Sequence, residues 1–174
     1  MIRMIEDADI PVILDWYNFY IEHSSATFET EPLTLETFTK RVHMITEKYP
    51  WIILEKDGKP VGYAYLGSFM ERAAYDWTCD LALYLDPEER GKGYGTELMN
   101  AIIETAEKCG YVNLVSIVTM GNRASEHLHE KAGFRVMGQF EHSGYKFDQW
   151  WGITWYGRCL KDQDDKPSPL SITL

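Results

Sequence analysis

The feature that most constrains this chain is a glycine loop, Arg90-Gly91-Lys92-Gly93-Tyr94-Gly95, between an apolar strand pattern ending near Leu85 and a helical pattern beginning near Tyr94. At the start of a helix, free backbone N–H groups and the helix dipole favour a bound anion. Glycines remove the Cβ atoms that would hold the backbone away, and they permit positive φ where the loop curls. This pattern indicates a pyrophosphate site at a strand-to-helix junction.

The letters of the loop alone do not separate a phosphate site from a plain strand-to-helix turn, in which Arg90 and Lys92 would be solvated charges. Two familiar phosphate motifs are absent from the sequence. There is no Gly-x-x-x-x-Gly-Lys-Ser/Thr, and no Gly-x-Gly-x-x-Gly opens a βαβ unit from the N-terminus. Both interpretations therefore stay open at this point.

Composition limits the remaining classes. The 174 residues suit one domain, and 45% hydrophobic and 14% aromatic residues favour a folded globule. No apolar run approaches the roughly 18 residues that a membrane span needs, and the N-terminus lacks a signal-peptide pattern. Three distant cysteines without a CxxC pair argue against structural zinc or disulfides and favour a reducing cytosol. With a net charge of -10, we expect a cytoplasmic protein that binds neither nucleic acid nor membranes.

Hydrophobic periodicity predicts seven strands and four helices, in the order βααβββαβαββ. The strands are expected over residues 1–5, 51–55, 61–66, 78–85, 112–118, 134–140 and 153–160, and the helices from Ile10, after Thr34, over 93–108 and over 122–132. Asp57-Gly58 predicts a tight hairpin turn, and Gly110 a left-handed helix cap. The order predicts an α/β sandwich with a mixed sheet. Residues 1–160 would form this single domain, and the polar tail 161–174 is expected to be poorly ordered.

Several separated motifs then resemble one family. The glycine loop resembles the Arg/Gln-x-x-Gly-x-Gly/Ala signature of the GNAT superfamily of N-acetyltransferases, and residues 122–125 and 128–134 resemble its late helix and turn. Residues 17–21, 25–32, 62–65, 72–78 and 144–147 resemble the phosphinothricin acetyltransferase-like branch, which includes enzymes acting on methionine sulfone and methionine sulfoximine. The resemblance covers residues 2 to about 160. It implies the GNAT fold, with a mostly antiparallel central sheet of about seven strands flanked by about four helices, and acetyl-CoA as co-substrate.

The resemblance implies a set of coenzyme contacts. The backbone of one strand would pair with the pantetheine arm through Leu83, Tyr84 and Leu85. The pyrophosphate would be bound by Arg90, Gly91, Lys92, Gly93, Tyr94, Gly95 and Thr96. Asn122 would hold the coenzyme at the next strand–helix junction. Asparagine is also a common helix N-cap, and both uses can coexist.

Two residues are candidates for proton transfer. Asp80 aligns with a position where relatives of the phosphinothricin type carry a glutamate, the proposed general base. Because aspartate is one methylene shorter, a bridging water becomes more favourable. An ordinary carboxylate is also a weak base for an ammonium group, so burial would have to raise its pKa. The alternative for Asp80 is a strand-edge carboxylate in an ion pair or facing solvent.

His129 takes a place where many GNAT members have a tyrosine that is thought to protonate the leaving thiolate. Imidazolium can donate a proton near neutral pH. The alternative is an ordinary histidine on a helix surface. His127 lies two residues away and points elsewhere on a helix, so the pair lacks metal-ligand spacing. We expect no metal.

The acceptor pocket is also implied by the resemblance. Arg72 and Tyr75 follow a strand at the turn where this branch places part of the pocket, and arginine can pair bidentately with a substrate carboxylate. In relatives the loop of Phe28 and Glu29 closes over the acceptor, so Glu29 could receive an ammonium and Phe28 an apolar chain. Asp80, Leu81, Ala82 and Lys146 complete the predicted set. Solvated side chains are the alternative for Arg72 and Lys146.

These predictions favour transfer of acetyl from acetyl-CoA to the primary amine of a small amino-acid-like acceptor. The acceptor would be of the phosphinothricin, methionine sulfone or methionine sulfoximine type, attacking directly with general-base assistance. One alternative is an enzyme of the same fold that acetylates a protein N-terminus or lysine, which needs an open groove. Another is a catalytically silent acyl-CoA-binding module. The resemblance and the aromatic C-terminal strands also suggest a homodimer.

Overall fold

The computed structural model describes residues 1–161, 167–172 and 174, and its centre is one seven-stranded sheet in the order β1-β2-β3-β4-β5-β7-β6. The strands are β1 (Ile2–Met4), β2 (Trp51–Lys56), β3 (Lys59–Ser68), β4 (Thr78–Leu85), β5 (Asn113–Thr119), β6 (Arg135–Lys146) and β7 (Gln149–Cys159). Only β4 and β5 pair in parallel, and every other neighbouring pair is antiparallel. The prediction of a mixed, mostly antiparallel sheet is confirmed.

Four α-helices flank the sheet within the described part of the chain: α1 (Ile10–His23), α2 (Leu35–Thr46), α3 (Tyr94–Cys109) and α4 (Arg123–Lys131). The predicted start and stop signals act as expected. The Thr34 side chain accepts from Thr37 N and caps α2, while Gly110, at φ 96°, ends α3 in the left-handed conformation. No helix among these residues is long and apolar enough to cross a membrane.

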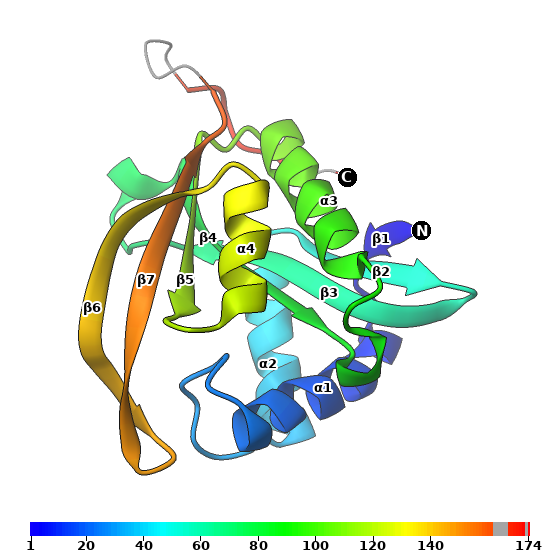
Figure 1. Ribbon diagram of the computed structural model, residues 1–174. Helices are drawn as coiled ribbons and strands as arrows, with labels where there is room; N and C mark the ends of the chain where they lie inside the picture. The colour runs from blue at the N-terminus through cyan, green and yellow to red at the C-terminus, as the bar shows by residue number, and fades with distance from the viewer. Residues whose placement is uncertain (162–166, 173) are drawn as a thin grey trace.

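Two hydrophobic cores lie on opposite faces of the sheet. On one face α3 contributes Leu98, Ile102 and Ala106 to a cluster with alternate residues of β2, β3 and β4. On the other face, α1 and α2 pack around Trp51 and Tyr63. Alternation along the strands divides the side chains between these two cores. Figure 1 shows α3 and α4 together on one side of the sheet, with α1 and α2 on the other.

The last two strands are longer than predicted, and they form a hairpin that projects from the body of the domain (Figure 1). The sequence pattern predicted an end near Phe140. The strand instead continues to Lys146, past a register shift between Phe140 and Gly144. This irregularity breaks the two-residue alternation from which strands are recognised, so the pattern stopped early.

Part of the polar tail lies outside the described residues, namely 162–166 and 173. In the remainder, Ser168 O accepts a hydrogen bond from Trp77 Nε1 at 2.8 Å, and Ser171 N donates to Cys109 O at 3.0 Å. These two bonds hold residues 168–171 against the C-terminal end of α3.

Candidate active site

The site begins where β4 and β5 separate. The two strands pair over only three positions, of which Asp80 opposite Val115 is the last. Beyond that point β4 continues to Leu85 paired with β3, and no other strand of the described residues pairs with its second edge. Backbone donors and acceptors on an open strand edge can pair with an extended ligand.

Hydrogen-bond alternation identifies the backbone groups that face this edge. Asp86 N donates to Val61 O of β3 at 3.0 Å, which makes this pair a hydrogen-bonded one. In an antiparallel pair such positions alternate with outward-facing ones. The backbone groups of Leu81, Leu83 and Leu85 therefore point away from β3 and into the space between the strands.

A single cavity of about 840 Å³ follows this open edge. It runs from the glycine loop before α3, past Leu83 and Asp80, to Ser25 after α1 and Trp151 on β7. Pockets of about 300–1,000 Å³ are typical of sites for small ligands. One cavity thus connects the predicted phosphate loop with the predicted general base.

The glycine loop has the conformation that an anion cradle requires. Gly91 and Gly93 have φ values of 79° and 84°, and the space where a Cβ would stand is open at both positions. Gly93 is the N-cap of α3 and carries no side chain to cap the helix, so the N–H groups of the first two helical residues stay available. The Arg90 guanidinium lies over the rings of Phe19 and Tyr20 of α1, 6.0 Å from each centroid, which anchors the loop.

Most of the predicted coenzyme residues line the cavity, and two do not. Lining residues are Leu83, Tyr84, Leu85, Arg90, Gly91, Gly93, Gly95, Thr96 and Asn122. Lys92 instead pairs with Glu89 at 2.7 Å, and the ring of Tyr94 lies under Lys56 Nζ at 5.3 Å. The Asn122 side chain accepts from Ser125 N and so caps α4 while it faces the cavity.

Asp80 lies in the cavity on the α1/α2 side of β4. Burial raises the pKa of Asp80 to about 6. A hydrogen bond from the Leu81 N–H lowers this pKa, but by less than burial raises it. The cross-strand partner of Asp80 on β3 is Gly67, and the space where its Cβ would stand is open. A base with a pKa of about 6 is ionised at neutral pH and stronger than an ordinary aspartate. The required rise in pKa is therefore present.

His129 is buried and is not an ordinary surface histidine, because only 3% of it is exposed. Its Nδ1 lies 2.8 Å from Ser125 O, and its Nε2 lies 2.9 Å from Ser116 Oγ. Burial lowers the pKa of His129, with a smaller opposing effect from the Ser125 carbonyl. Neutral imidazole therefore dominates at neutral pH, which works against the predicted role as a proton donor to a thiolate.

Lys146 fastens one end of the loop after α1. The sequence predicts a contact of this residue with the acceptor instead. Lys146 is 4% exposed, and its Nζ donates to Ser24 O and Thr27 O, both at 2.8 Å. It does not line the cavity. The β6–β7 hairpin brings Lys146 next to the loop, so its ammonium group holds the backbone of residues 24–27. The sequence carries no sign of this long-range contact.

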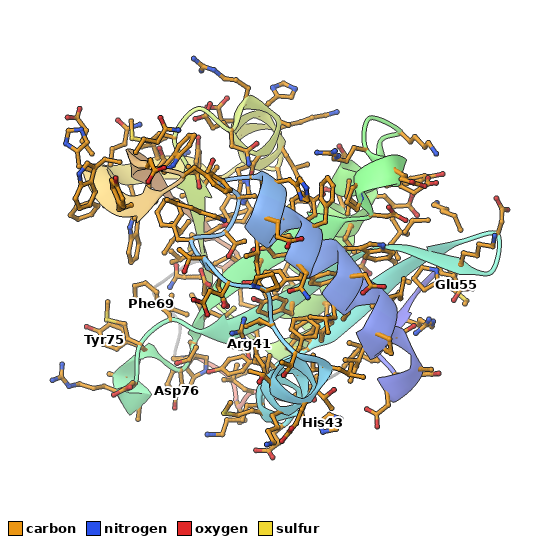
Figure 2. The ribbon with its side chains drawn as sticks, turned by 90° about the horizontal axis from the view of Figure 1, so that it is seen from below. Arg41, His43, Glu55, Phe69, Tyr75 and Asp76 are labelled. Atoms are coloured by element: carbon orange, nitrogen blue, oxygen red, sulfur yellow. The ribbon has the colours of Figure 1, made fainter. Side chains whose placement is uncertain are left out.

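Glu29 has a partner that the sequence did not indicate. Its Oε1 accepts from Arg41 Nη1 of α2 at 2.6 Å and from the Tyr17 hydroxyl at 3.2 Å. Figure 2 shows where Arg41 projects from α2. Because this carboxylate already has a cation beside it, it is not an open receptor for an ammonium group, and it fastens the second end of the loop to α2.

Arg72 and Tyr75 lie on the segment between β3 and β4 and outside the cavity lining. Both are exposed, and Phe69 and Tyr75 contact each other edge to face at 5.8 Å (Figure 2). Phe69 also contacts Trp155 of β7. The chain by itself does not bring Arg72 and Tyr75 together with Asp80.

Phe28 packs on a glycine of the hairpin, and this contact gives a test of the loop. A Cβ at Gly144 would lie 2.3 Å from two ring carbons of Phe28, so Gly144→Ala must displace Phe28 and the loop. We expect the KM for the acceptor amine to rise roughly tenfold or more, because small misplacements of positioning groups are costly. Coenzyme affinity should stay within about twofold, since the glycine loop is untouched.

The control is Gly138→Ala on the same strand, where no atom lies within 4 Å of the added Cβ. This variant should leave the acceptor KM and the coenzyme affinity unchanged. Equal acceptor KM values in the two variants, measured by steady-state kinetics, would contradict a role of the Phe28 contact in acceptor binding.

The cavity also contains residues that the sequence did not single out as functional, among them Tyr20, Tyr65 and Ser116. Burial, and then the neighbouring Tyr17 and Asp80, raise the pKa of Tyr65. Ser116 could have been noticed as a hydroxyl between apolar residues in the middle of β5. Tyr20 and Tyr65 carry no such signal, because aromatic residues at these spacings are usual in a core. Among residues that the structure describes, no three metal-ligand side chains gather.

The fold and the site together define a class. A cavity that joins a glycine-rich helix start to a partly buried carboxylate of raised pKa combines an anion site with a proton acceptor, which are the parts of an enzyme site for a phosphate-bearing ligand. Over residues 2–155 the chain matches the acetyltransferase (GNAT) domain family, and it belongs to that family.

Two relatives and one solved structure support membership of the same family. The phosphinothricin N-acetyltransferase of Streptomyces viridochromogenes is 31% identical over 90% of this chain and 86% of its own length. The L-methionine sulfoximine/L-methionine sulfone acetyltransferase of Pseudomonas paraeruginosa is 32% identical over 84% and 87%. The crystal structure of a GNAT superfamily phosphinothricin acetyltransferase from Sinorhizobium meliloti in complex with AcCoA matches with a TM-score of 0.92 at 28% identity, covering 97% of this chain and 92% of that one.

Proposed function

We propose that this protein transfers acetyl from acetyl-CoA to the primary amine of a small amino-acid-like acceptor of the phosphinothricin, methionine sulfone or methionine sulfoximine type. The observation that carries the proposal is the single cavity that joins the glycine loop to the carboxylate of Asp80 along the open edge of β4. The acetyltransferase names of the relatives support the same reaction.

The residues present fit acetyl-CoA. Gly91 and Gly93 leave open a cradle that Cβ atoms would fill, at a helix start that favours pyrophosphate. The outward-facing backbone of Leu83 can pair with an extended arm, and Asn122 lies at the next strand–helix junction. Bound there, the coenzyme supplies the activated acyl group as a thioester.

The chain itself then handles one proton and one developing charge. Asp80 takes the proton that the amine sheds, directly or through a water, because its pKa of about 6 leaves it ionised at neutral pH. The N–H of Leu83 is a backbone donor on the open edge and stabilises the oxygen on which charge develops. His129 stays a predicted proton donor for the departing thiol, and burial disfavours that role.

A small acceptor is favoured over a peptide. The cavity of about 840 Å³ must hold the coenzyme arm as well as the acceptor, which leaves room for a molecule of amino-acid size. The loop that borders it is fixed at both ends, by Lys146 and by the pair of Glu29 with Arg41. An open groove for a polypeptide would require this loop to be released.

The test is release of free thiol from acetyl-CoA with phosphinothricin, methionine sulfone, methionine sulfoximine and a peptide with a free N-terminus, each against an amine-free blank. We expect thiol release with at least one small acceptor and none with the peptide. Release only with the peptide would favour the protein-acetylating alternative. Coenzyme binding by calorimetry with no release for any amine would favour the silent acyl-CoA-binding module.

A homodimer through β6 is also proposed, together with the cytoplasmic location expected from the sequence. The support for the dimer is a group of exposed apolar side chains on the β6–β7 hairpin: Val136, Met137, Phe140, Tyr145, Phe147 and Trp150. Exposed apolar patches of this kind mark contact surfaces. Light scattering should give twice the chain mass, and Met137→Glu should give the chain mass. A monomeric parent protein would contradict the dimer.

A further inference from the structure

The open edge of β4 has a hydroxyl group near each end. The Tyr20 hydroxyl donates to Leu85 O at 2.9 Å, and Ser116 Oγ lies 3.0 Å from Leu81 O. Between them, no side chain of the described residues bonds the outward-facing backbone of Leu83. These two hydroxyls therefore engage two of the outward-facing carbonyls with which an extended ligand could pair.

Ser116 has one hydroxyl proton and two neighbours that can accept it. Its Oγ lies 3.0 Å from Leu81 O and 2.9 Å from Nε2 of His129. On the far side of the ring, His129 Nδ1 lies 2.8 Å from Ser125 O. A carbonyl oxygen only accepts, so Nδ1 carries a proton, and in the neutral ring Nε2 is then an acceptor.

The three hydrogen bonds coexist only when both ring nitrogens are protonated. In the imidazolium, Nε2 donates to Ser116 Oγ, and the Ser116 proton goes to Leu81 O. In the neutral ring, Nε2 takes the Ser116 proton and Leu81 O loses its donor. A carbonyl left without a donor beside a ligand cavity is available to the ligand, and leaving it unpaired is costly.

We propose that Ser116 is a positioning residue that closes or opens the Leu81 carbonyl according to the charge on His129. With neutral His129, Leu81 O accepts a hydrogen bond from an amide of the coenzyme arm; with the imidazolium, Ser116 occupies that oxygen. The Tyr20 hydroxyl donates to Leu85 O in both states, because Tyr20 takes no part in the pair of Ser116 with His129. The identity of the ligand in this inference rests on the proposed function.

The charge on the His129 ring depends on its burial and on its contacts with Ser116 and Ser125. From β7 Tyr156 contacts the ring at 5.3 Å, and Phe134 contacts it edge to face at 5.2 Å. The charged residues that share α4 with His129 include Glu126, which bonds Gly121 N, and Glu130, which is exposed. On the strands beside α4, Arg158 bonds Ala132 O, and Asp80 lies on the opposite face of β4. Because burial lowers the pKa of His129, the open state dominates at neutral pH.

Binding and protonation must then be linked reciprocally. If coenzyme A prefers the open state, its binding lowers the pKa of His129. We expect a fall of about 0.5 to 1 pH unit, which corresponds to about three- to tenfold tighter binding to the neutral form. The measurement is an NMR pH titration of the His129 ring with and without coenzyme A, with His129→Gln identifying the resonance. Adenosine 3′,5′-bisphosphate, which lacks the arm, should cause no such fall.

Three variants separate the switch from a structural effect. Ser116→Ala removes the hydroxyl and should abolish the fall, while Ser116→Thr should retain it. Ser125→Ala is the matched control, because its Oγ lies 3.4 Å from the same ring and away from Leu81, so the fall should persist. An unchanged His129 pKa in the parent protein with coenzyme A bound, or a full fall in Ser116→Ala, would overturn the inference. Absence of coenzyme A binding by calorimetry would overturn the proposed function as well.

Discussion

Replacing Asp80 by asparagine is expected to lower kcat/KM by about 10²–10⁴-fold, the usual contribution of a positioned general base. Because the base must be ionised, kcat/KM of the parent enzyme should rise with pH through about 6, where the partly buried carboxyl of Asp80 titrates. In Asp80→Asn this acidic limb should disappear, and in Asp80→Glu it should remain. Steady-state rates between pH 5 and pH 8 measure both effects.

Replacing Asp80 by asparagine should also stabilise the fold. The pKa of Asp80 is raised in the folded state from an ordinary 3.8 to about 6, so folding disfavours the charged form. The native state therefore loses stability as the pH rises from about 4 to about 6, and it stays less stable above that range. Asparagine removes this cost, which is at most about 3 kcal/mol. Denaturant unfolding at pH 7.5 should show a more stable Asp80→Asn, so its lost activity would not reflect unfolding. An active variant with an unchanged pH profile would exclude Asp80 as the base.

Gly93→Val is expected to weaken coenzyme A binding by about 100-fold, because it disturbs several backbone donors that each contribute about 1.5–3 kcal/mol to a charged ligand. Gly93 has a φ of 84°, which a β-branched residue does not adopt without strain, and the new side chain would stand in the open cradle. Calorimetry with coenzyme A measures the effect.

The matched control is Gly58→Val. Gly58 also has a positive φ, 74°, and open space at its Cβ position, but it lies in the β2–β3 hairpin and outside the cavity lining. Both variants should lose about 1–3 kcal/mol of stability from backbone strain. Only Gly93→Val should lose coenzyme affinity. Equal losses of affinity in the two variants would mean that strain, and not the cradle, determines binding.

Local chemistry made much of the fold predictable. Thr34, Gly93 and Gly110 mark helix ends through capping and positive φ, which depend on a few neighbouring residues. The strand over 78–85 was predicted with the bounds that β4 has. The end of β6 was not, because a register shift within it interrupts the alternation.

The acceptor side was less predictable, since its contacts join residues far apart in the chain. Lys146 holds backbone atoms about 120 residues away, and Glu29 pairs with a side chain on α2. Such pairing depends on where the hairpin and α2 lie after folding. A carboxylate or ammonium in the sequence carries no mark of whether its partner is a substrate or another part of the protein.

The glycine loop shows which properties follow from the sequence and which depend on the tertiary structure. The sequence by itself determined a helix start with glycines where positive φ is needed, because both properties are local to residues 91–95. Only the tertiary structure decided that this loop opens into the same cavity as Asp80. The reason is that β4 and β5 stop pairing after Asp80 and Val115, and the separation of two strands is set by what packs on each, which no local pattern encodes.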